Sequence, residues 1–249
     1  MLALAECVLG DWEAAGRASD EGYEVALQTG QRPQQVFTLA ARALLAAYRG
    51  QVEAARVNAA EALERAGGRG STGATMIAVS ALGLLELSLG RPDEAHRHLG
   101  PVVQYVDAEG IAEPGVLRFV FDDVEALIAL GLPEDAEATL ARVERESVRL
   151  DRASGLAASA RCRGRLAASA GDVEGASAAF EAALAAHDRV PMPFERARTL
   201  LALGVAHRRA KRKRAAREAL DEALAVFERL GAPLWAERAR AELGRIGGR

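Results

Sequence analysis

The chain has few aromatic residues and few cysteines. Aromatic residues make up 4% of its 249 residues, although 50% are hydrophobic. The apolar share is therefore mostly alanine and leucine, which favours helices packed closely through small side chains. The two cysteines, Cys7 and Cys162, cannot form a disulfide framework, and neither has a metal-binding partner nearby in the sequence. We expect both to be core thiols of a protein in a reducing compartment.

An excess of charge of one sign is also missing, because 32 basic and 35 acidic residues leave a net charge of −3. This balance argues against a protein whose whole surface binds nucleic acid. No apolar run approaches the roughly 18 residues that a membrane helix needs, and the apolar start has no basic segment of the signal-peptide kind. We therefore expect a cytoplasmic protein without a membrane partner.

Motifs for catalysis and cofactor binding are absent from the sequence. There is no GxxxxGK(S/T) phosphate-binding motif, and the glycines at 67–73 read as an inter-repeat loop. His96 and His98 lie two residues apart, so on a helix they diverge and cannot share a metal ion. The acid pairs Asp122–Asp123 and Glu134–Asp135 are predicted to be solvated or to cap helices. We predict that the chain is not an enzyme and has no metal and no cofactor.

What the chain does have is an internal repeat with a period of about 40 residues, in the range of helical-repeat proteins. Polar turns end its hydrophobic helical stretches at Gly10, Gly50, Gly90, Gly131, Gly171 and Ala210. An alanine stands five residues after each turn, at Ala15, Ala55, Ala95, Ala136, Ala176 and Ala215. An acid stands three residues after the first five turns, at Glu13, Glu53, Asp93, Glu134 and Glu174.

Each recurring residue type has a physical role. Glycine adopts positive φ after a helix end, and an acid in the first turn of the next helix faces unpaired N–H groups. The alanine marks a point where two helices cross closely. Each period carries two patterns of helical spacing and so predicts a helical hairpin.

Hairpins of this kind stack, because each exposes an apolar face that only its neighbour covers. We predict an all-α, right-handed superhelical solenoid of about six antiparallel hairpins, with thirteen helices and no sheet. Residues 1–249 are predicted to form a single repeat domain. Its first helix is short and its last has no second helix after it, so we expect a piece of a longer chain.

The turn pattern resembles the tetratricopeptide repeat, in which Gly-Asp-aromatic opens the second helix, as in GDWEAA at 10–15. That family also favours a small residue seven positions before the turn, matched by Ala3, Ala43, Gly83 and Gly164. The fourth and sixth repeats depart with Val124 and Leu203, although Gly204 is adjacent to the latter. The period also exceeds the length of about 34 residues that is usual for that repeat.

The segment FERLGAPLWAERARAELGRIGGR at 227–249 is similar to segments that precede the DNA-binding helix-turn-helix in MalT-like, large ATP-binding LuxR-family transcription regulators. The resemblance implies that the superhelix receives an inducer or partner. It also implies a nucleotide-binding module and a DNA-binding domain outside this chain, so DNA is expected to be bound only through that missing helix-turn-helix.

In tetratricopeptide-type stacks the first helix of each hairpin lines the concave face. That register predicts a surface for an effector or partner at Phe37, Leu44, Tyr48, Arg118, Phe121, Arg161 and Arg165. Arginine and aromatic residues are enriched at recognition surfaces, but packing in the core explains Phe37 and Phe121 better. We expect Trp12 and Trp235 to pack between helices.

The basic run at 207–217 is the strongest local charge feature of the chain. One interpretation is contact with phosphate through Arg208, Arg209, Lys211, Arg212 and Lys213. The favoured interpretation is a solvated turn, because most charge runs are solvated and no aromatic residues for base stacking interrupt this one.

We predict a non-catalytic sensor and protein-interaction module of a LuxR-family transcriptional regulator, which binds a protein, peptide or small-molecule effector on its concave face. The alternative is a stand-alone tetratricopeptide-type scaffold that binds peptides or proteins. Self-association is a further alternative. An enzyme would require several titratable groups converging in a pocket, which the sequence does not indicate.

Overall fold

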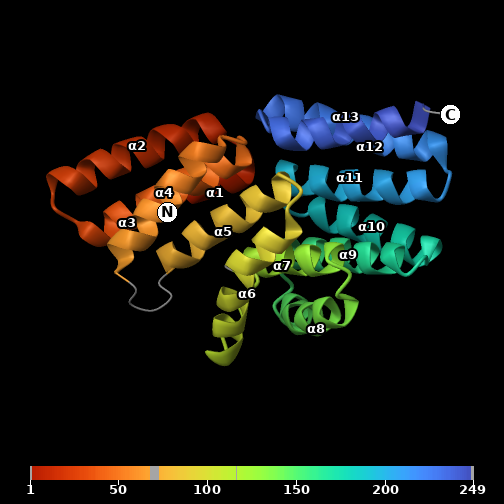
Figure 1. The fold of residues 1–249 in the computed structure, drawn as a ribbon, viewed down its shortest axis with the longest axis horizontal. Helices are drawn as coiled ribbons and strands as arrows, with labels where there is room; N and C mark the ends of the chain where they lie inside the picture. Colours follow the sequence, from red (N-terminus) through yellow and green to blue (C-terminus); the bar gives the residue numbers. More distant parts are fainter. Residues whose placement is uncertain (1, 68–72, 116, 248–249) are drawn as a thin grey trace. The chain divides into compact units, whose positions relative to one another are not determined.

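The computed structural model describes residues 2–67, 73–115 and 117–247, and every regular element in them is an α-helix. The first helices of the repeats are α1 (Leu2–Leu9), α3 (Arg32–Tyr48), α5 (Gly73–Ser88), α7 (Arg118–Ala129), α9 (Ala153–Ser169), α11 (Pro193–Arg209) and α13 (Pro233–Gly247) (Figure 1). The second helices are α2 (Trp12–Gln28), α4 (Val52–Ala66), α6 (Pro92–Ala108), α8 (Pro133–Arg149), α10 (Val173–His187) and α12 (Lys213–Leu230). The predicted all-α hairpin repeat with thirteen helices is confirmed for these residues. The loop predicted at 67–73 lies almost entirely outside them.

The turns between first and second helices follow the predicted geometry in five repeats. Positive φ, from 65° to 87°, occurs at Gly10, Gly50, Gly90, Gly131 and Gly171. The second helices then begin as expected. Asp11 and Asp172 each accept a hydrogen bond from a backbone N–H three residues later, at 3.0 and 2.9 Å, which stabilises the helix start.

The sixth turn corrects the prediction by one residue. Ala210 has φ −75° and caps α11, whereas Lys211 has φ +62° and occupies the position that glycine holds elsewhere. The buried alanine of this repeat is consequently Ala216, which is 0% exposed, and not the half-buried Ala215. The register shifts because α11 continues one residue further than the glycine pattern indicates.

The same shift restores the small residue seven positions before the turn, which is Gly204 rather than Leu203. A Cβ at Gly204 would lie 2.5 Å from Leu220 Cγ, and a Cβ at Gly164 would lie 2.7 Å from Phe180 Cε1. Glycine in the first helix therefore leaves room for a large side chain of the second helix. In the second repeat the corresponding residues are Ala43 and Ala59, both 0% exposed.

Contacts divide the chain into two compact units, Met1–Ile111 (unit 1) and Ala112–Arg249 (unit 2). In unit 1, α3 contacts α1, α2, α4 and α5. The ring of Trp12 stacks on that of Tyr48 with centroids 5.4 Å apart, and its Nε1 donates to the Cys7 carbonyl at 3.0 Å. Trp12 therefore packs between helices, as predicted.

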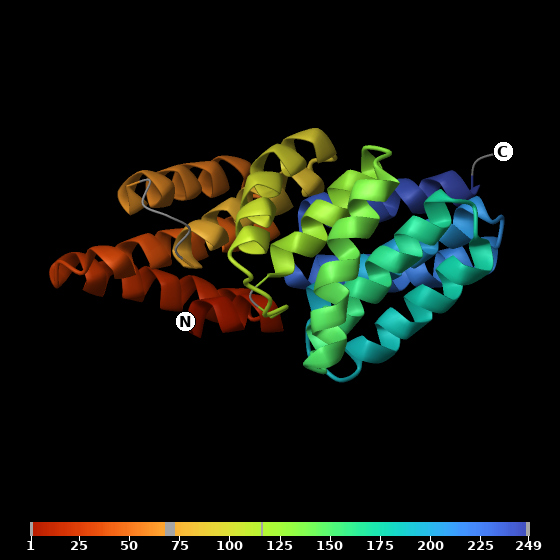
Figure 2. The same cartoon turned by 90° about the horizontal axis from the view of Figure 1, so that it is seen from below.

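In unit 2, α9 to α13 lie as neighbouring rows (Figure 1). The first helices contact one another in the order α7, α9, α11 and α13, and each second helix contacts the first helix before and after it. Figure 2 shows this arrangement from below. The unit thus has one layer of first helices and one of second helices. Whether both units form a single domain stays a prediction.

One further expectation is met in the part of the chain that the structure describes. Cys7 and Cys162 are both buried, as core thiols should be. No helix there has both the length and the apolar character needed to cross a membrane.

Candidate functional site

The first helices of unit 2 gather charged side chains away from solvent. Glutamates and an aspartate of α7 and α11 meet arginines of α9 and α11 in what we call the ion-pair network: Asp122, Glu125, Arg161, Arg165, Glu195 and Arg198. Arg161 and Arg198 have side chains only 2% exposed. Buried charges require counter-charges, because loss of hydration is costly.

The ion-pair network meets this requirement through short contacts. Arg161 Nε donates to Glu125 at 2.7 Å, and its Nη1 lies 2.8 Å from Glu195. Arg198 Nη2 lies 2.7 Å from Asp122 and 3.2 Å from Glu125. Arg165 reaches Glu125 at 3.8 Å, so this one carboxylate serves three arginines.

The surroundings shift the pKa values of the three acids in different directions. Burial raises the pKa of Glu195, but Arg198 and Arg161 more than offset it and lower the pKa to about 2. At Glu125, burial again raises the pKa, but the charges of Arg198 and Arg161 outweigh it, and the pKa falls well below its usual range. At Asp122 burial outweighs Arg198 and raises the pKa to about 6. All three are mainly ionised at neutral pH.

The network corrects the expectation that Asp122 and Asp123 are solvated. Their exposure is 8% and 2%, because α7 is packed between neighbouring helices and Arg198 of α11 supplies the counter-charge of Asp122. Glu134 and Asp135 do lie in the first turn of α8, as predicted.

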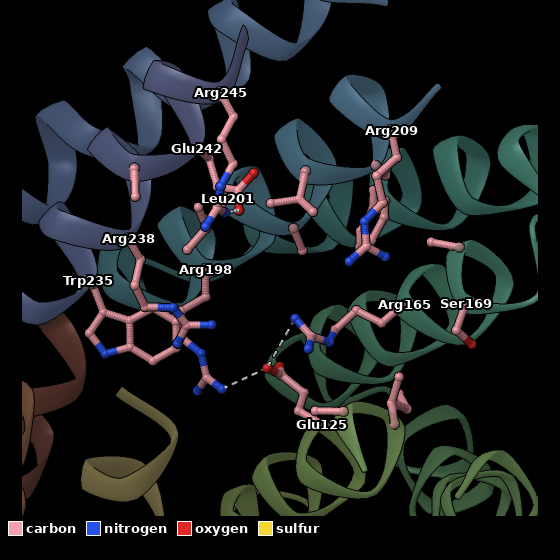
Figure 3. A pocket seen from close by; sticks show the side chains of 18 residues that line it. Glu125, Arg165, Ser169, Arg198, Leu201, Arg209, Trp235, Arg238, Glu242 and Arg245 are labelled. Atoms are coloured by element: carbon pink, nitrogen blue, oxygen red, sulfur yellow. Dashed lines mark hydrogen bonds and ion pairs between the residues drawn. The ribbon is translucent and has the colours of Figure 1, made fainter. Parts of the chain in front are cut away.

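Beside the ion-pair network lies a cavity of about 560 Å³, which we call the arginine cavity after Arg165, Arg198, Arg209, Arg238 and Arg245 in its walls (Figure 3). Its other polar lining residues are Glu125, Ser169, Trp235 and Glu242, and its apolar ones include Ile128, Leu201 and Val205. The lining comes mainly from α7, α9, α11 and α13. The cavity is thus a feature of the layer of first helices.

One wall of the cavity is built around Trp235 of α13. The guanidinium groups of Arg238 and Arg198 lie over its ring at 4.5 and 5.0 Å. Phe194 and Phe227 pack against the ring with centroids 5.6 and 5.9 Å away. Trp235 therefore packs between helices, as predicted, and in addition lines the cavity, which the sequence did not indicate.

The residues predicted for a recognition surface are divided by the structure. Leu44, Tyr48 and Phe121 are 5%, 5% and 1% exposed, because contacts between helices cover them, so they present no surface to a ligand. Arg161 is buried in the ion-pair network. Phe37 and Arg118 are half-buried, and Arg165 lines the cavity. A binding role for these last three stays a prediction.

The basic run is partly neutralised by acids of unit 2. Arg208 Nε donates to Glu242 at 2.6 Å, and Arg212 pairs with Glu174. Lys211 and Lys213 are exposed. Arg209 is exposed and lines the arginine cavity (Figure 3).

Cavity residues that the sequence analysis missed could have been found by aligning the repeats. Glu125, Val205 and Arg245 stand at the repeat position of Arg165, which was predicted, and all four line the cavity. Arg198 and Arg238 are related in the same way. Equal positions in stacked repeats lie on the same face, so the recurrence of charge at these positions was the available signal.

No group of histidine, cysteine or acidic residues within the described ranges could hold a metal ion. His187, for example, is buried and lies 3.2 Å from the Thr199 hydroxyl. Burial, followed by the charge of Arg161, lowers its pKa to about 4. This histidine is therefore a neutral core residue at neutral pH.

Comparisons with known proteins identify the repeat type. Residues 155–229, from α9 to α12, match the tetratricopeptide repeat family. The comparison with curated proteins finds no match. Among solved structures, BtubC (BKLC) from P. vanneervenii is similar over 98% of this chain and 93% of that chain, with 22% sequence identity and a TM-score of 0.58. This likeness shows the fold alone. The chain is an all-α helical-repeat protein, and residues 155–229 match a repeat family that is typically non-catalytic and binds proteins or peptides.

Proposed function

We propose that the chain is a non-catalytic scaffold that binds a peptide segment of a partner protein on the layer of first helices in unit 2. The observation that carries this proposal is the arginine cavity, which lies among four successive first helices. The match to tetratricopeptide repeats covers three of the helices that line it, α9, α10 and α11, and supports the same surface.

The lining suits a peptide for two reasons. Arginine and tryptophan are the residues that most often dominate binding energy at interfaces, and here they stand beside the apolar side chains of Leu201 and Val205. The ion-pair network also ties α7, α9 and α11 together, so the surface is held in place before a peptide arrives. Such preorganisation lowers the entropic cost of binding.

A peptide array tests this proposal. The full chain is probed against short, unrelated peptides that span a range of charge and hydropathy. Val205→Glu introduces a carboxylate into the cavity, whereas Val148→Glu makes the same change on α8 at a side chain 63% exposed.

We expect a subset of the peptides to bind the native chain and the Val148→Glu control. The same peptides should bind Val205→Glu at least about tenfold more weakly, the effect of losing one central contact. Circular dichroism confirms that both variants are folded. Equal binding by the two variants, or no peptide bound above background, would contradict the proposal.

A second candidate is a sensor of a LuxR-family regulator, supported by the resemblance of residues 227–249. This segment contains α13, whose Trp235, Arg238 and Glu242 line the cavity, so an effector there would contact the helix nearest the chain end. An effector would act by binding two states with different affinity. A reading frame that stops at Arg249, with no nucleotide-binding module upstream, would contradict this candidate.

Two smaller proposals accompany these functions. Contact between phosphate and the exposed part of the basic run is tested by an electrophoretic shift assay, and absence of salt-sensitive DNA binding rejects it. Residence in the cytoplasm is supported by the two buried cysteines and is tested by locating the tagged protein.

A further inference from the structure

The unsatisfied polar atoms around the arginine cavity are all hydrogen-bond donors. Arg165 Nε, Arg198 Nε and Trp235 Nε1 are buried and have no hydrogen-bond partner among the described residues. Arg198 and Trp235 are each only 3% exposed. Neither arginine nor tryptophan offers an acceptor, and a buried donor without an acceptor is unfavourable. The polar side chains in the cavity wall are thus mainly donors, and a ligand that offers acceptors suits them.

The cavity also has an excess of positive charge. Five arginines and two glutamates line it. Both glutamates are shared, since Glu125 contacts three arginines and Glu242 contacts Arg208 and Arg245. Arg209 makes no ion pair with any described residue. The ligand should therefore carry negative charge.

Arg238 shows the effect of burial first and of this excess second. Burial and then the nearby charge of Arg165 lower the pKa of its guanidinium group to about 10. The cavity thus disfavours a further positive charge even on an arginine. A bound anion would relieve this repulsion by the same electrostatic interaction.

The directions of the donors distinguish between kinds of anion. Arg165 comes from α9 and Arg209 from α11, and Figure 3 shows both beside one open space. A carboxylate accepts hydrogen bonds largely in one plane, whereas the oxygens of a phosphoryl group point in tetrahedral directions. Guanidinium groups pair with phosphate through two parallel hydrogen bonds. Donors that approach one space from two different helices suit the tetrahedral directions of a phosphoryl group.

The size and the apolar part of the lining define the rest of the ligand. A volume of about 560 Å³ lies within the range of small-molecule sites. Leu201 and Val205 offer apolar contacts next to the arginines. We propose that the arginine cavity binds a small phosphate monoester, with its phosphoryl group between Arg165 and Arg209 and its organic part against Leu201 and Val205. This inference assigns the cavity of the proposed peptide site a second kind of ligand, and its test does not depend on whether peptides bind.

Calorimetric titration and thermal shift of the full chain test the site, with glycerol 3-phosphate as the probe at constant ionic strength. Glycerol is the neutral control, inorganic phosphate tests the phosphoryl group alone, and citrate tests a carboxylate ligand. We expect saturable binding of glycerol 3-phosphate that weakens with salt, weaker binding of inorganic phosphate and citrate, and none of glycerol.

A pair of variants places the binding in the cavity. Arg209→Gln removes one guanidinium group from the cavity, and Arg214→Gln makes the same change on α12 at a side chain 92% exposed. Arg209→Gln should weaken binding of glycerol 3-phosphate about tenfold or more, as loss of a charge-assisted hydrogen bond does. Arg214→Gln should leave binding within about twofold of the native chain.

Three results would overturn the proposal. The first is absence of saturable binding of glycerol 3-phosphate to the folded native chain. The second is equal weakening in the two variants, which would indicate general attraction to a basic surface. The third is citrate binding more tightly than glycerol 3-phosphate, which would assign the cavity to carboxylates. Melting temperatures of the unliganded variants near that of the native chain show that the comparison is made on folded protein.

Discussion

The contact between Gly164 and Phe180 predicts a strong coupling between two residues in different helices. Gly164 lies in α9, and an added Cβ would lie 2.7 Å from Cε1 of Phe180 in α10. Phe180 is 1% exposed and lines the arginine cavity with part of its ring, so its contact with α9 is in the interior. Gly164→Ala therefore forces the two helices apart or the ring out of its preferred position.

The size of the effect follows from opposing contributions. Overpacking of a tight core costs about 1 to 3 kcal/mol, and alanine in a helix gains about 1 kcal/mol over glycine. Gly164→Ala should thus lower the free energy of unfolding by about 1 kcal/mol. Phe180→Ala alone should lower it by about 4 kcal/mol through the cavity that it creates.

The double variant should be less damaged than the sum of the single variants. With the ring gone the new methyl group no longer clashes, and the pair then matches Ala43 and Ala59 of the second repeat. We expect the double variant to lose about 3 kcal/mol instead of about 5 kcal/mol, a coupling of about 2 kcal/mol.

Urea denaturation followed by circular dichroism measures all four free energies. Gly244→Ala is the matched control, because nothing lies within 4 Å of an added Cβ at that position of α13. It should be neutral or stabilise unit 2 by up to about 1 kcal/mol. If the two single changes at Gly164 and Phe180 add within about 0.5 kcal/mol, the packing relation between them is wrong.

Three other predictions concern charge and backbone conformation. Arg198→Met should lower the free energy of unfolding by about 3 to 5 kcal/mol, because buried carboxylates lose their partner. Arg196 pairs with Glu222 at side chains that are 35% and 50% exposed, so Arg196→Met should lower it by at most about 1 kcal/mol. Urea denaturation measures both changes. The pKa of Glu195 is about 2, whereas its ordinary value is 4.5. The ionised Glu195 therefore stabilises the folded state by about 3 kcal/mol above about pH 4.5, and this contribution is lost as the pH falls toward 2. In a series of unfolding measurements below about pH 4, where Asp122 is already protonated, the free energy of unfolding of Glu195→Gln should fall less steeply with pH than that of the native chain. An unchanged slope would contradict this. Lys211→Gly should raise the melting temperature by about 2 to 4 °C, since it relieves φ +62° at a gain of about 1 kcal/mol, and a lower melting temperature would refute it.

The hairpins could be predicted because their signals are local. Gly50 needs only its own freedom of φ to end one helix, and Glu53 and Ala55 lie within the next helical turns. The sixth turn was misplaced because Lys211 takes the left-handed conformation without being glycine. Nothing in the local sequence marks that strain. Only the burial of Ala216 in the structure shows where the sixth repeat is in register with the others.

The candidate site was predicted less completely, because its parts lie far apart in the chain. Arg165 was named from the register of first helices, and Arg209 from the basic run. The importance of Arg198 and Arg238 was missed, since an isolated arginine on a helix is most often solvated. Their separation by one repeat was visible in the sequence, but these positions were not compared between repeats.

The sequence by itself determined the repeat, the alternation of first and second helices and most of the turns, because these depend on residues within a few positions of one another. Only the tertiary structure decided which charges are buried and where a cavity remains. Asp122 and Arg198 are 76 positions apart, yet they lie 2.7 Å from each other. The environment of such a pair depends on how the repeats stack, and stacking depends on side-chain volumes summed over many residues.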